Sequence, residues 1–213
     1  MTPHSFHGDE KPKPGRMFII SAPSGAGKST LRRAILKRFP NLRYSISFTT
    51  RPPRTGERNG VDYHFINHDA FLEKRRRNQW VEWAEVHGNY YGSSAPFLDR
   101  AIASGQDIFL DIDVQGTAQI LKRYPNTVTI FIMPPSISVL KQRLEKRGTD
   151  NPAEIEKRLV NAEQEMDRKD LYDHIIVNDD LTQAIETLAQ VVTAHHTGNR
   201  TDQKKGPPPG AFK

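Results

Sequence analysis

The sequence has no cysteine among its 213 residues, which excludes a disulfide scaffold and a cysteine-liganded zinc site. It lacks any apolar run of the roughly 18 to 20 residues that a membrane-spanning helix needs, and its first residues lack the apolar stretch of a secretory signal. Aromatic residues are few, at 8%, while hydrophobic residues make up 36%. We therefore expect a soluble, cytoplasmic protein with one compact core and no contact with a membrane.

The sequence is basic, with a formal net charge of +6 at pH 7. A positive balance favours an anionic partner, which at this point is a nucleic acid, an acidic surface or a nucleotide phosphate. Much of the excess lies at 74–77 and near the termini, where a solvent-exposed helix face or a flexible tail accounts for it. The basic residues lack the interleaved aromatic residues of a single-strand channel, so we expect no nucleic-acid partner.

Short apolar segments rich in Ile, Val and Phe recur along the chain without alternating with polar residues. Such segments predict strands that are buried on both faces of a parallel sheet. Amphipathic helical patterns fall between them, as at Leu31, Ile35 and Phe39. The alternation of strand and helix predicts a doubly wound α/β core with right-handed crossovers. The five predicted strands are 17–21, 43–47, 108–112, 127–133 and 174–177.

The segment 51–97 does not fit this core. It has alternating apolar residues at 61–66, a helical pattern from Asp69, a strand-like stretch at 80–86 and a turn-like Gly-Asn-Tyr-Tyr-Gly at 88–92. Alternation at every second residue is typical of a sheet that is buried on one face only. The segment therefore predicts an inserted lobe made of a small antiparallel sheet and a helix.

A second segment, 143–168, is almost wholly charged, which favours a mobile helical lid. Within it, Asn151, Pro152 and Glu154 form the start signal of a helix that carries Arg158. Both ends of the chain have the composition of flexible tails. We thus expect tails at 1–15 and 195–213, a core made of 16–50, 98–142 and 169–194, the lobe at 51–97 and the lid at 143–168.

The segment 21–30 joins an apolar strand to an amphipathic helix and reads Ser-Ala-Pro-Ser-Gly-Ala-Gly-Lys-Ser-Thr. Glycines at Gly25 and Gly27 let successive backbone N–H groups point inward at an anion, and the start of the helix adds its positive end. Lys28 is then placed to reach the β and γ phosphates of a nucleotide, and the Ser29 hydroxyl to ligate Mg²⁺. This is the context that a P-loop requires.

The loop departs from the usual G-x-x-x-x-G-K-[ST] pattern because Ala22 stands where the first glycine belongs. A plain turn between a strand and a helix would explain the glycines, but it would not need Lys-Ser-Thr at the start of the helix. The sequence therefore predicts a P-loop NTPase-type core. Its predicted ATP-binding residues are Ser24, Gly25, Ala26, Gly27, Lys28, Ser29 and Thr30.

A proline-stiffened loop at 47–57 carries Arg51 and Arg54, three residues apart. Arginine presents a planar fork that binds phosphate with two hydrogen bonds, and the prolines lower the entropy cost of holding it. We interpret the loop as a clamp for a monophosphate, although exposed arginines in a solvated loop explain the pattern equally well when it is taken alone.

Further along the lobe, Glu82 lies between two tryptophans, an environment in which a carboxylate is costly to bury without a partner. Guanine offers two adjacent donors, N1–H and N2–H₂, which one carboxylate accepts together, whereas adenine has an acceptor at N1. Glu82 is therefore a candidate for selecting guanine, and hydroxyls nearby are candidates for the base edge or the phosphate. A packing role is the alternative for each residue singly.

Two carboxylates, Asp111 and Asp113, follow a predicted core strand at the sheet edge where α/β proteins bind ligands. They are candidates for holding Mg²⁺ through water or for accepting a base amino group, with helix capping or a core hydrogen bond as the alternative. In the charged segment, Arg143, Arg147 and Arg158 are candidates for covering the phosphates, unless they simply form a solvated helix face.

Taken together, these residues resemble the guanylate kinase family over roughly 17–192, and the bacterial enzymes in particular, whose P-loop also accepts alanine at its first position. The resemblance implies a GMP site made of Ser47, Arg51, Arg54, Tyr63, Glu82, Tyr91 and Ser93, with Asp111 close to the guanine. It implies that Arg54, Arg147 and Arg158 act on the transferring phosphoryl group and that Asn178 and Asp179 border the ATP adenine. Lys28 completes the expected catalytic set, and Ser29 and Asp113 are the residues expected to serve Mg²⁺.

The expected activity is transfer of the γ-phosphoryl group of ATP to GMP, and to dGMP, with Mg²⁺. Three alternatives stay open at this point. One is a guanylate-kinase-like interaction module without catalysis, against which an intact Lys28 and arginine set argue. The others are an ATP-dependent nucleic-acid-binding protein and a kinase for another nucleoside monophosphate. The oligomeric state does not follow from the sequence.

Overall fold

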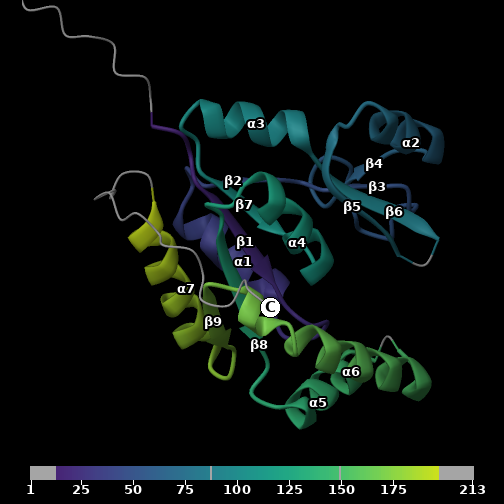
Figure 1. The fold of residues 1–213 in the computed structure, drawn as a ribbon. Coiled ribbons are helices and arrows are strands. Elements are labelled where there is room, and N and C mark those ends of the chain that lie inside the picture. Colours follow the sequence, from purple (N-terminus) through teal and green to yellow (C-terminus); the bar gives the residue numbers. More distant parts are fainter. Residues whose placement is uncertain (1–12, 87, 149, 197–213) are drawn as a thin grey trace, which may run out of the picture.

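The computed structural model describes residues 13–86, 88–148 and 150–196. Its centre is a five-stranded sheet with strand order β2-β7-β1-β8-β9 (Figure 1). Every neighbouring pair in it is parallel. The five predicted segments all supply strands, although the second is much shorter than predicted. The strands are β1 (Met17–Ser21), β2 (Arg43–Tyr44), β7 (Ile108–Asp111), β8 (Val128–Met133) and β9 (His174–Val177).

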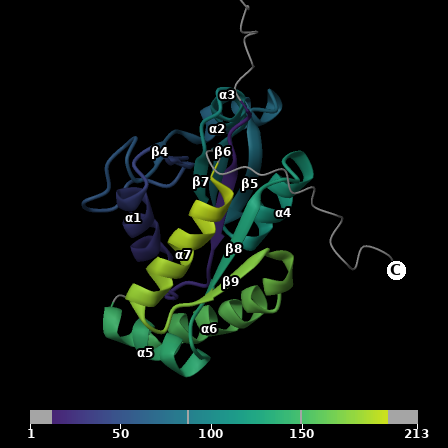
Figure 2. The ribbon, with the colours of Figure 1, turned by 90° about the vertical axis from the view of Figure 1, so that its left-hand side faces the viewer.

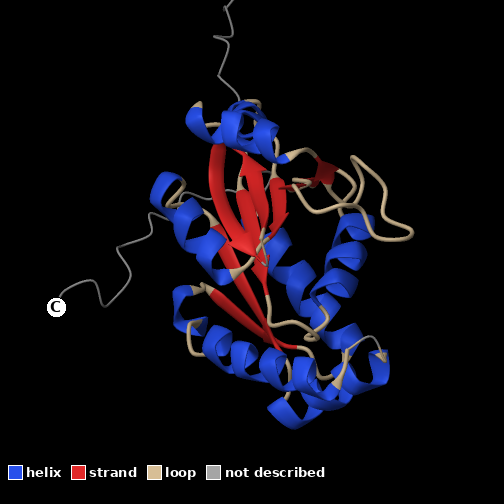
Figure 3. Ribbon diagram, turned by 90° about the vertical axis from the view of Figure 1, so that its right-hand side faces the viewer, coloured by secondary structure: helices blue, strands red, loops and turns tan. Residues whose placement is uncertain are grey.

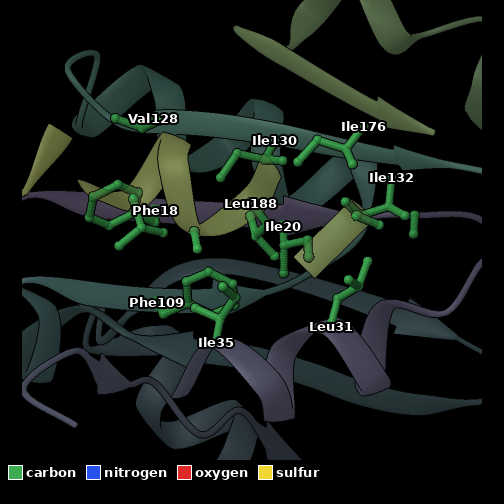
Figure 4. Packing of buried hydrophobic residues seen from close by; sticks show 14 of the residues in the cluster. Phe18, Ile20, Leu31, Ile35, Phe109, Val128, Ile130, Ile132, Ile176 and Leu188 are labelled. Carbon is green, nitrogen blue, oxygen red and sulfur yellow. The ribbon is translucent and has the colours of Figure 1, made fainter. Parts of the chain in front are cut away.

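Helices cover both faces of this sheet, as the doubly wound prediction requires (Figures 2 and 3). On one face, α1 (Lys28–Arg38) and α7 (Leu181–His195) pack against Phe18 and Ile20 of β1, as Figure 4 shows. On the other face, α3 (Ala95–Ala103) and α4 (Val114–Arg123) pack against Met17 and Ile19. Because successive strand residues point to opposite faces, an unbroken apolar segment buries both sides of the sheet.

The lobe holds a second sheet with strand order β4-β3-β6-β5 and the helix α2 (His68–Arg76). It lies apart from the lid helices, with the core between them (Figure 1). The predicted antiparallel sheet is wrong in one respect, because β3 and β4 pair in parallel. The predicted turn at 88–92 is confirmed only at Gly88, since 89–92 belong to a strand. The strands are β3 (Phe48–Thr49), β4 (His64–Phe65), β5 (Trp80–Val86) and β6 (Asn89–Ser94).

The charged segment forms helices. Helix α5 (Ile137–Arg147) begins before this segment and ends within it. Helix α6 (Pro152–Met166) starts at the predicted position, where Asn151 and Glu154 complete a capping box. The two helices share a small apolar contact that includes Leu140, Leu144, Ile155 and Leu159. A short turn of 3-10 helix (Lys169–Leu171) then leads into β9. The lid therefore has its own minor core, attached to the sheet at both ends.

The ends of the described chain are held in place. The Gly15 amide donates to the Ile102 carbonyl at 2.8 Å, and a Cβ on Gly15 would lie 2.0 Å from the Gln106 carbonyl oxygen. At the other end, α7 runs to His195. The predicted tail boundaries at 15 and 195 are therefore displaced outward, while the remainder of both predicted tails, 1–12 and 197–213, lies outside the described residues.

Candidate active site

The loop that follows β1 adopts the turn that the P-loop prediction requires. Gly25 and Gly27 have φ values of 101° and 99°, in the left-handed region that favours glycine. Gly27 is the N-cap of α1, so the loop amides lead directly into the positive end of that helix. Ala22 has no positive φ, which explains physically why this loop tolerates alanine at the position of the first glycine.

Close packing constrains the same two glycines. The Asn178 side-chain amide donates to the Ala26 carbonyl at 2.7 Å, and a Cβ on Gly27 would lie only 2.2 Å from that amide nitrogen. A Cβ on Gly25 would lie 2.8 Å from the Leu140 side chain. The loop is therefore clamped between the end of β9 and the lid helix α5.

A cavity of about 460 Å³ lies between the core and the lobe. We call it the lobe-side cavity. It brings together side chains from the P-loop, from both ends of the lobe and from the end of β7, which are far apart in the sequence. Its lining includes the predicted residues Ser24, Lys28, Ser47, Tyr63, Glu82, Tyr91, Asp111 and Asp113, together with Arg32, Tyr44, Ala84, Val86 and Ile112.

Three further residues of the predicted GMP site do not line this cavity. The Ser93 hydroxyl donates to a carboxylate oxygen of Glu82 at 2.6 Å. The Arg51 guanidinium donates to both carboxylate oxygens of Glu57, at 2.9 and 3.0 Å, and its Cζ lies 5.6 Å from the centre of the Tyr63 ring. The backbone amide of Arg54 donates to the same carboxylate at 2.7 Å, while the Arg54 side chain is exposed. Glu57 thus organises both arginines of the predicted phosphate clamp.

A second cavity of about 360 Å³ lies on the other side of the P-loop and is called the lid-side cavity. The Arg143 guanidinium, on α5, donates to the Asn178 carbonyl at 2.9 Å and so holds the lid helix beside the loop. Arg147 lies one helical turn further on and is exposed. The lining consists of Gly25, Gly27, Thr30, Arg143, Lys146, Arg147, Asn178, Asp179 and Leu181.

The third lid arginine reaches the P-loop itself. One nitrogen of Arg158 donates to the Ser24 hydroxyl at 2.7 Å, and another lies 3.1 Å from the Asp150 carboxylate. Arg143 and Arg158, the lid's two anchored arginines, thus come from different helices and hold both of them against the loop.

Glu82 is the most unusual group in the lobe-side cavity, because its carboxyl is buried with an exposure of only 6%. Burial raises its pKa to about 7, with the hydrogen bond from Ser93 opposing the shift and the charge of Asp113 adding to it. Gly116 makes room for this carboxylate, since a Cβ there would lie 3.0 Å from its second oxygen. A carboxylate held this way has unused acceptor capacity that faces the cavity.

Comparison with known proteins decides the family. A family model described as "Guanylate kinase" matches residues 14–195.

The chain belongs to the guanylate kinase family. The guanylate kinase of Cupriavidus metallidurans is 49% identical over 181 residues, which cover 85% of this chain and 84% of that protein. The guanylate kinase of Thermotoga maritima is 42% identical over 191 residues, covering 90% and 92% respectively. A crystal structure of guanylate kinase from Anaplasma phagocytophilum matches with a TM-score of 0.70 and 31% identity over 86% of this chain and 87% of that one.

The two residues predicted to serve Mg²⁺ differ in their surroundings. Ser29 lies in the first turn of α1, directly after Lys28. Asp113 is the N-cap of α4, and one of its oxygens accepts the Gly116 amide at 2.7 Å, so the alternative capping role is present. Within the described residues no group of three or more His, Cys, Asp or Glu forms a metal site. One hydroxyl and one free carboxylate oxygen still fit Mg²⁺, which takes most of its ligands from water and nucleotide phosphates.

Several residues of the site escaped the sequence reasoning, among them four that carry a polar group or border a nucleotide cavity. Arg32 and Tyr44 line the lobe-side cavity, and Leu181 lines the lid-side cavity. Glu165, on α6, has its pKa raised to about 7 by burial, with Lys28 opposing the shift and Asp113 adding to it. Only Arg32 had a usable signal, since it lies four residues after Lys28 and therefore on the same helix face. The described part of the chain contains no helix that is both long and apolar enough to cross a membrane.

The pKa of Glu82 predicts how a guanine nucleotide binds as pH changes. The carboxyl must be ionised to accept two N–H groups, so affinity for GMP should rise with pH up to about 7, where the free site ionises, and level off above it. Below that pH, protonation of Glu82 should raise the dissociation constant for GMP by about tenfold for each unit that the pH falls. Calorimetric titration with GMP between acid and neutral pH measures the slope.

The GMP phosphate itself titrates near pH 6, at about its ordinary second pKa, and contributes a slope of its own. The variant Glu82→Gln keeps that contribution and removes the one with a midpoint near 7. An unchanged pH profile in Glu82→Gln would contradict the assignment of the titrating group.

Proposed function

We propose that this chain transfers the γ-phosphoryl group of ATP to GMP, with ADP and GDP as products. The observation that carries the proposal is that one cavity is lined both by Lys28 of the P-loop and by the buried carboxylate of Glu82. A nucleoside monophosphate whose base binds Glu82 therefore has its phosphate on the same side as the phosphate-binding loop. Membership of the guanylate kinase family supports the same acceptor.

Recognition of guanine rests on Glu82. Its two oxygens accept N1–H and N2–H₂ together, while the Ser93 hydroxyl, 2.6 Å from one of them, fixes the orientation of the carboxylate. Asp111, at the end of β7, supplies a further acceptor for the base amino group. Adenine has an acceptor at N1, so it does not offer a carboxylate the two adjacent donors that guanine does.

The GMP phosphate is assigned to the lobe loop. The Arg51 guanidinium is already positioned, because one nitrogen donates to both Glu57 oxygens and another to the Pro52 carbonyl at 2.7 Å, and Arg54 lies three residues further along with its side chain exposed. Ser47, Tyr63 and Tyr91 bring hydroxyl groups to the same cavity. A preformed fork loses little conformational entropy when it binds phosphate.

The transfer step needs charge neutralisation and alignment. We assign Lys28 and the P-loop amides to the β and γ phosphates of ATP, and Arg54, Arg147 and Arg158 to the charge that spreads over the transferring group. The GMP phosphate attacks in line, so no covalent intermediate with the protein forms. When bound, Mg²⁺ supplies neutralisation of the phosphate oxygens, and Ser29 and Asp113 are the residues that would hold it, Asp113 through water.

The lid is assigned the exclusion of water. The contact of Arg158 with Ser24 ties α6 to the P-loop at 2.7 Å, and the contact of Arg143 with the Asn178 carbonyl ties α5 to the border of the lid-side cavity. A site closed over both nucleotides favours transfer to GMP over hydrolysis of ATP. Thr30, Asn178 and Asp179, which line the lid-side cavity, are assigned to ATP, together with Ser24 of the lobe-side cavity.

A single assay tests the proposal. ADP production from ATP and Mg²⁺ is measured by a coupled reaction with GMP, dGMP, AMP or UMP as the acceptor. We expect rapid turnover with GMP, turnover with dGMP, and far slower turnover with AMP and UMP. Absence of a preference for guanine would overturn the assignment of the acceptor, and absence of ADP with every acceptor would overturn the catalytic function.

A further inference from the structure

The carboxylate of Asp111 lies between two cations from the same helix. The Lys28 ammonium is 2.6 Å from one oxygen, and a guanidinium nitrogen of Arg32 is 3.4 Å from the other. Lys28 and Arg32 are four residues apart on α1, so both side chains leave the same face of the helix toward the end of β7. The Asp111 side chain is only 11% exposed, which makes its charge costly without a partner.

Arg32 is held in place by a residue of the edge strand. The same guanidinium nitrogen donates to the Tyr44 hydroxyl at 2.7 Å, and the Cζ of Arg32 lies 4.8 Å from the centre of the Tyr44 ring. Tyr44 ends β2 and pairs with Phe109 of β7, two residues before Asp111. Burial raises the pKa of the Tyr44 hydroxyl, and the charge of Asp111 adds to the shift, so the group stays a neutral acceptor.

The proposed reaction makes conflicting demands on Lys28. In the absence of nucleotide, Lys28 neutralises Asp111 in the lobe-side cavity. With ATP bound, the same ammonium is required at the phosphates, whose negative charge competes with the carboxylate for it. GMP adds another negative charge to the same cavity. Unless a second cation takes over at Asp111, each nucleotide weakens the binding of the other.

We propose that Arg32, held by Tyr44, is a positioning residue that keeps Asp111 neutralised and directed at the GMP site when Lys28 turns to ATP. Its role is to let both nucleotides bind at once. The inference rests on the proposed function, because it assumes that ATP and GMP occupy the two sides of the P-loop. It adds two residues, Arg32 and Tyr44, to the groups that determine the affinity for GMP.

The test measures the coupling between the two nucleotides. GMP is titrated calorimetrically into the full chain with Mg²⁺, once alone and once with a saturating non-hydrolysable β,γ-imido analogue of ATP. In Arg32→Met we expect GMP affinity without the analogue to change by less than about threefold, because Lys28 still serves Asp111. With the analogue present we expect the GMP affinity of Arg32→Met to fall by about tenfold or more relative to the wild type, an ordinary size for coupling between sites.

Reciprocity provides an internal check, since GMP must weaken binding of the analogue by the same factor. The matched control is Lys37→Met, because Lys37 is an exposed cation on the same helix α1 and lines neither the lobe-side nor the lid-side cavity. This control should keep the wild-type coupling. Arg32→Lys should weaken GMP binding in the presence of the analogue less than Arg32→Met does, because lysine supplies a cation but lacks the planar fork of arginine.

One further variant keeps the test decisive if Arg32→Met does not fold, and another tests whether the charge of Asp111 causes the effect. Tyr44→Phe removes only the hydroxyl that holds Arg32. It should weaken GMP binding in the presence of the analogue as Arg32→Met does, but to a smaller extent. Adding Asp111→Asn to the Arg32 variant removes the charge for which the cations compete, so the coupling should return toward the wild-type value even though GMP binds more weakly.

Three outcomes would overturn the inference. One is equal coupling in the wild type, Arg32→Met and Lys37→Met. Another is an equal loss of GMP affinity with and without the analogue, which indicates a direct contact of Arg32 with GMP or damage to the fold. The third is persistence of the coupling when Asp111→Asn is added. Failure of the proposed function itself is separate, because it appears as absence of GMP or analogue binding in the wild type.

Discussion

Replacing Arg147 with alanine should lower the turnover number by about a thousandfold while GMP affinity stays near that of the wild type, because an arginine that acts only on the transition state contributes to rate and little to ground-state binding. Arg147 belongs to the lid-side cavity, beside Gly25 and Gly27 of the P-loop, and not to the lobe-side cavity that holds Glu82. Its side chain is exposed, so truncation should leave the fold intact. Steady-state rates at saturating ATP and GMP measure the effect.

The control is Lys141→Ala, which removes an exposed cation from the same helix but from outside the lid-side cavity. It should keep the wild-type rate. Thermal unfolding of both variants should match the wild type, which separates a loss of chemistry from a loss of structure. Turnover close to the wild-type value in Arg147→Ala would remove this arginine from the catalytic set and leave Arg158, already in contact with Ser24, as the lid residue nearest the reaction.

The core of this fold was accessible from the sequence because its signals are local. The apolar segment of β1 is buried on both sides, and the glycines that follow it occupy backbone conformations that other residues avoid. The helix start at Asn151 and Pro152 is likewise determined by residues within one turn. In each case the residues that determine the local structure lie within a few positions of it in the sequence.

The lobe was harder, because its short strands depend on partners elsewhere in the chain. The alternation at 61–66 predicted a full strand, but only His64–Phe65 forms one, next to two-residue β3, while Tyr63 makes an isolated bridge with Asn59. Gly92 was interpreted as part of a turn. It lies instead inside β6, where a side chain would collide with the rings of Phe71 and Trp80 at 3.2 and 3.3 Å. A glycine required for close packing cannot be told from a turn glycine without the packing.

The site followed the same division. The residue types around the P-loop and Glu82 were recognisable as motifs, but their electrostatics are properties of long-range contacts. Ser93 meets Glu82 across two paired strands, and Arg32 meets Asp111 from 79 residues away. The resulting raised pKa of Glu82, and the sharing of Asp111 between two cations, depend on burial that the sequence alone does not display.

The second large effect is expected from Glu82→Gln, which should reduce the preference for GMP over AMP. Glutamine keeps the shape of the side chain but offers one acceptor and one donor in place of two acceptors, so its amide nitrogen opposes a donor of guanine. A lost hydrogen bond to a charged group is worth about 1.5–3 kcal/mol, and the unpaired donor adds a further penalty. We expect kcat/KM for GMP to fall by about 100-fold.

The same amide matches the edge of adenine, which has an acceptor at N1 and a donor at its amino group. AMP should therefore become a measurable acceptor in Glu82→Gln, and the ratio of the two kcat/KM values should fall by more than the loss with GMP alone. Comparing kcat/KM for GMP and AMP in the coupled assay gives this ratio directly. The matched control is Glu85→Gln, an exposed glutamate on the same strand that does not line the lobe-side cavity.

Stability should not obscure the result. Glu82 is buried and its pKa is raised to about 7, which shows that burying the ionised carboxylate costs folding free energy. The neutral amide of glutamine avoids that cost. Glu82→Gln should therefore unfold at a temperature no lower than the wild type near neutral pH. A folded variant with unchanged preference for GMP would assign guanine recognition to Asp111 and the neighbouring hydroxyls, whereas collapse of the ratio would identify Glu82 as the residue that distinguishes the two purines.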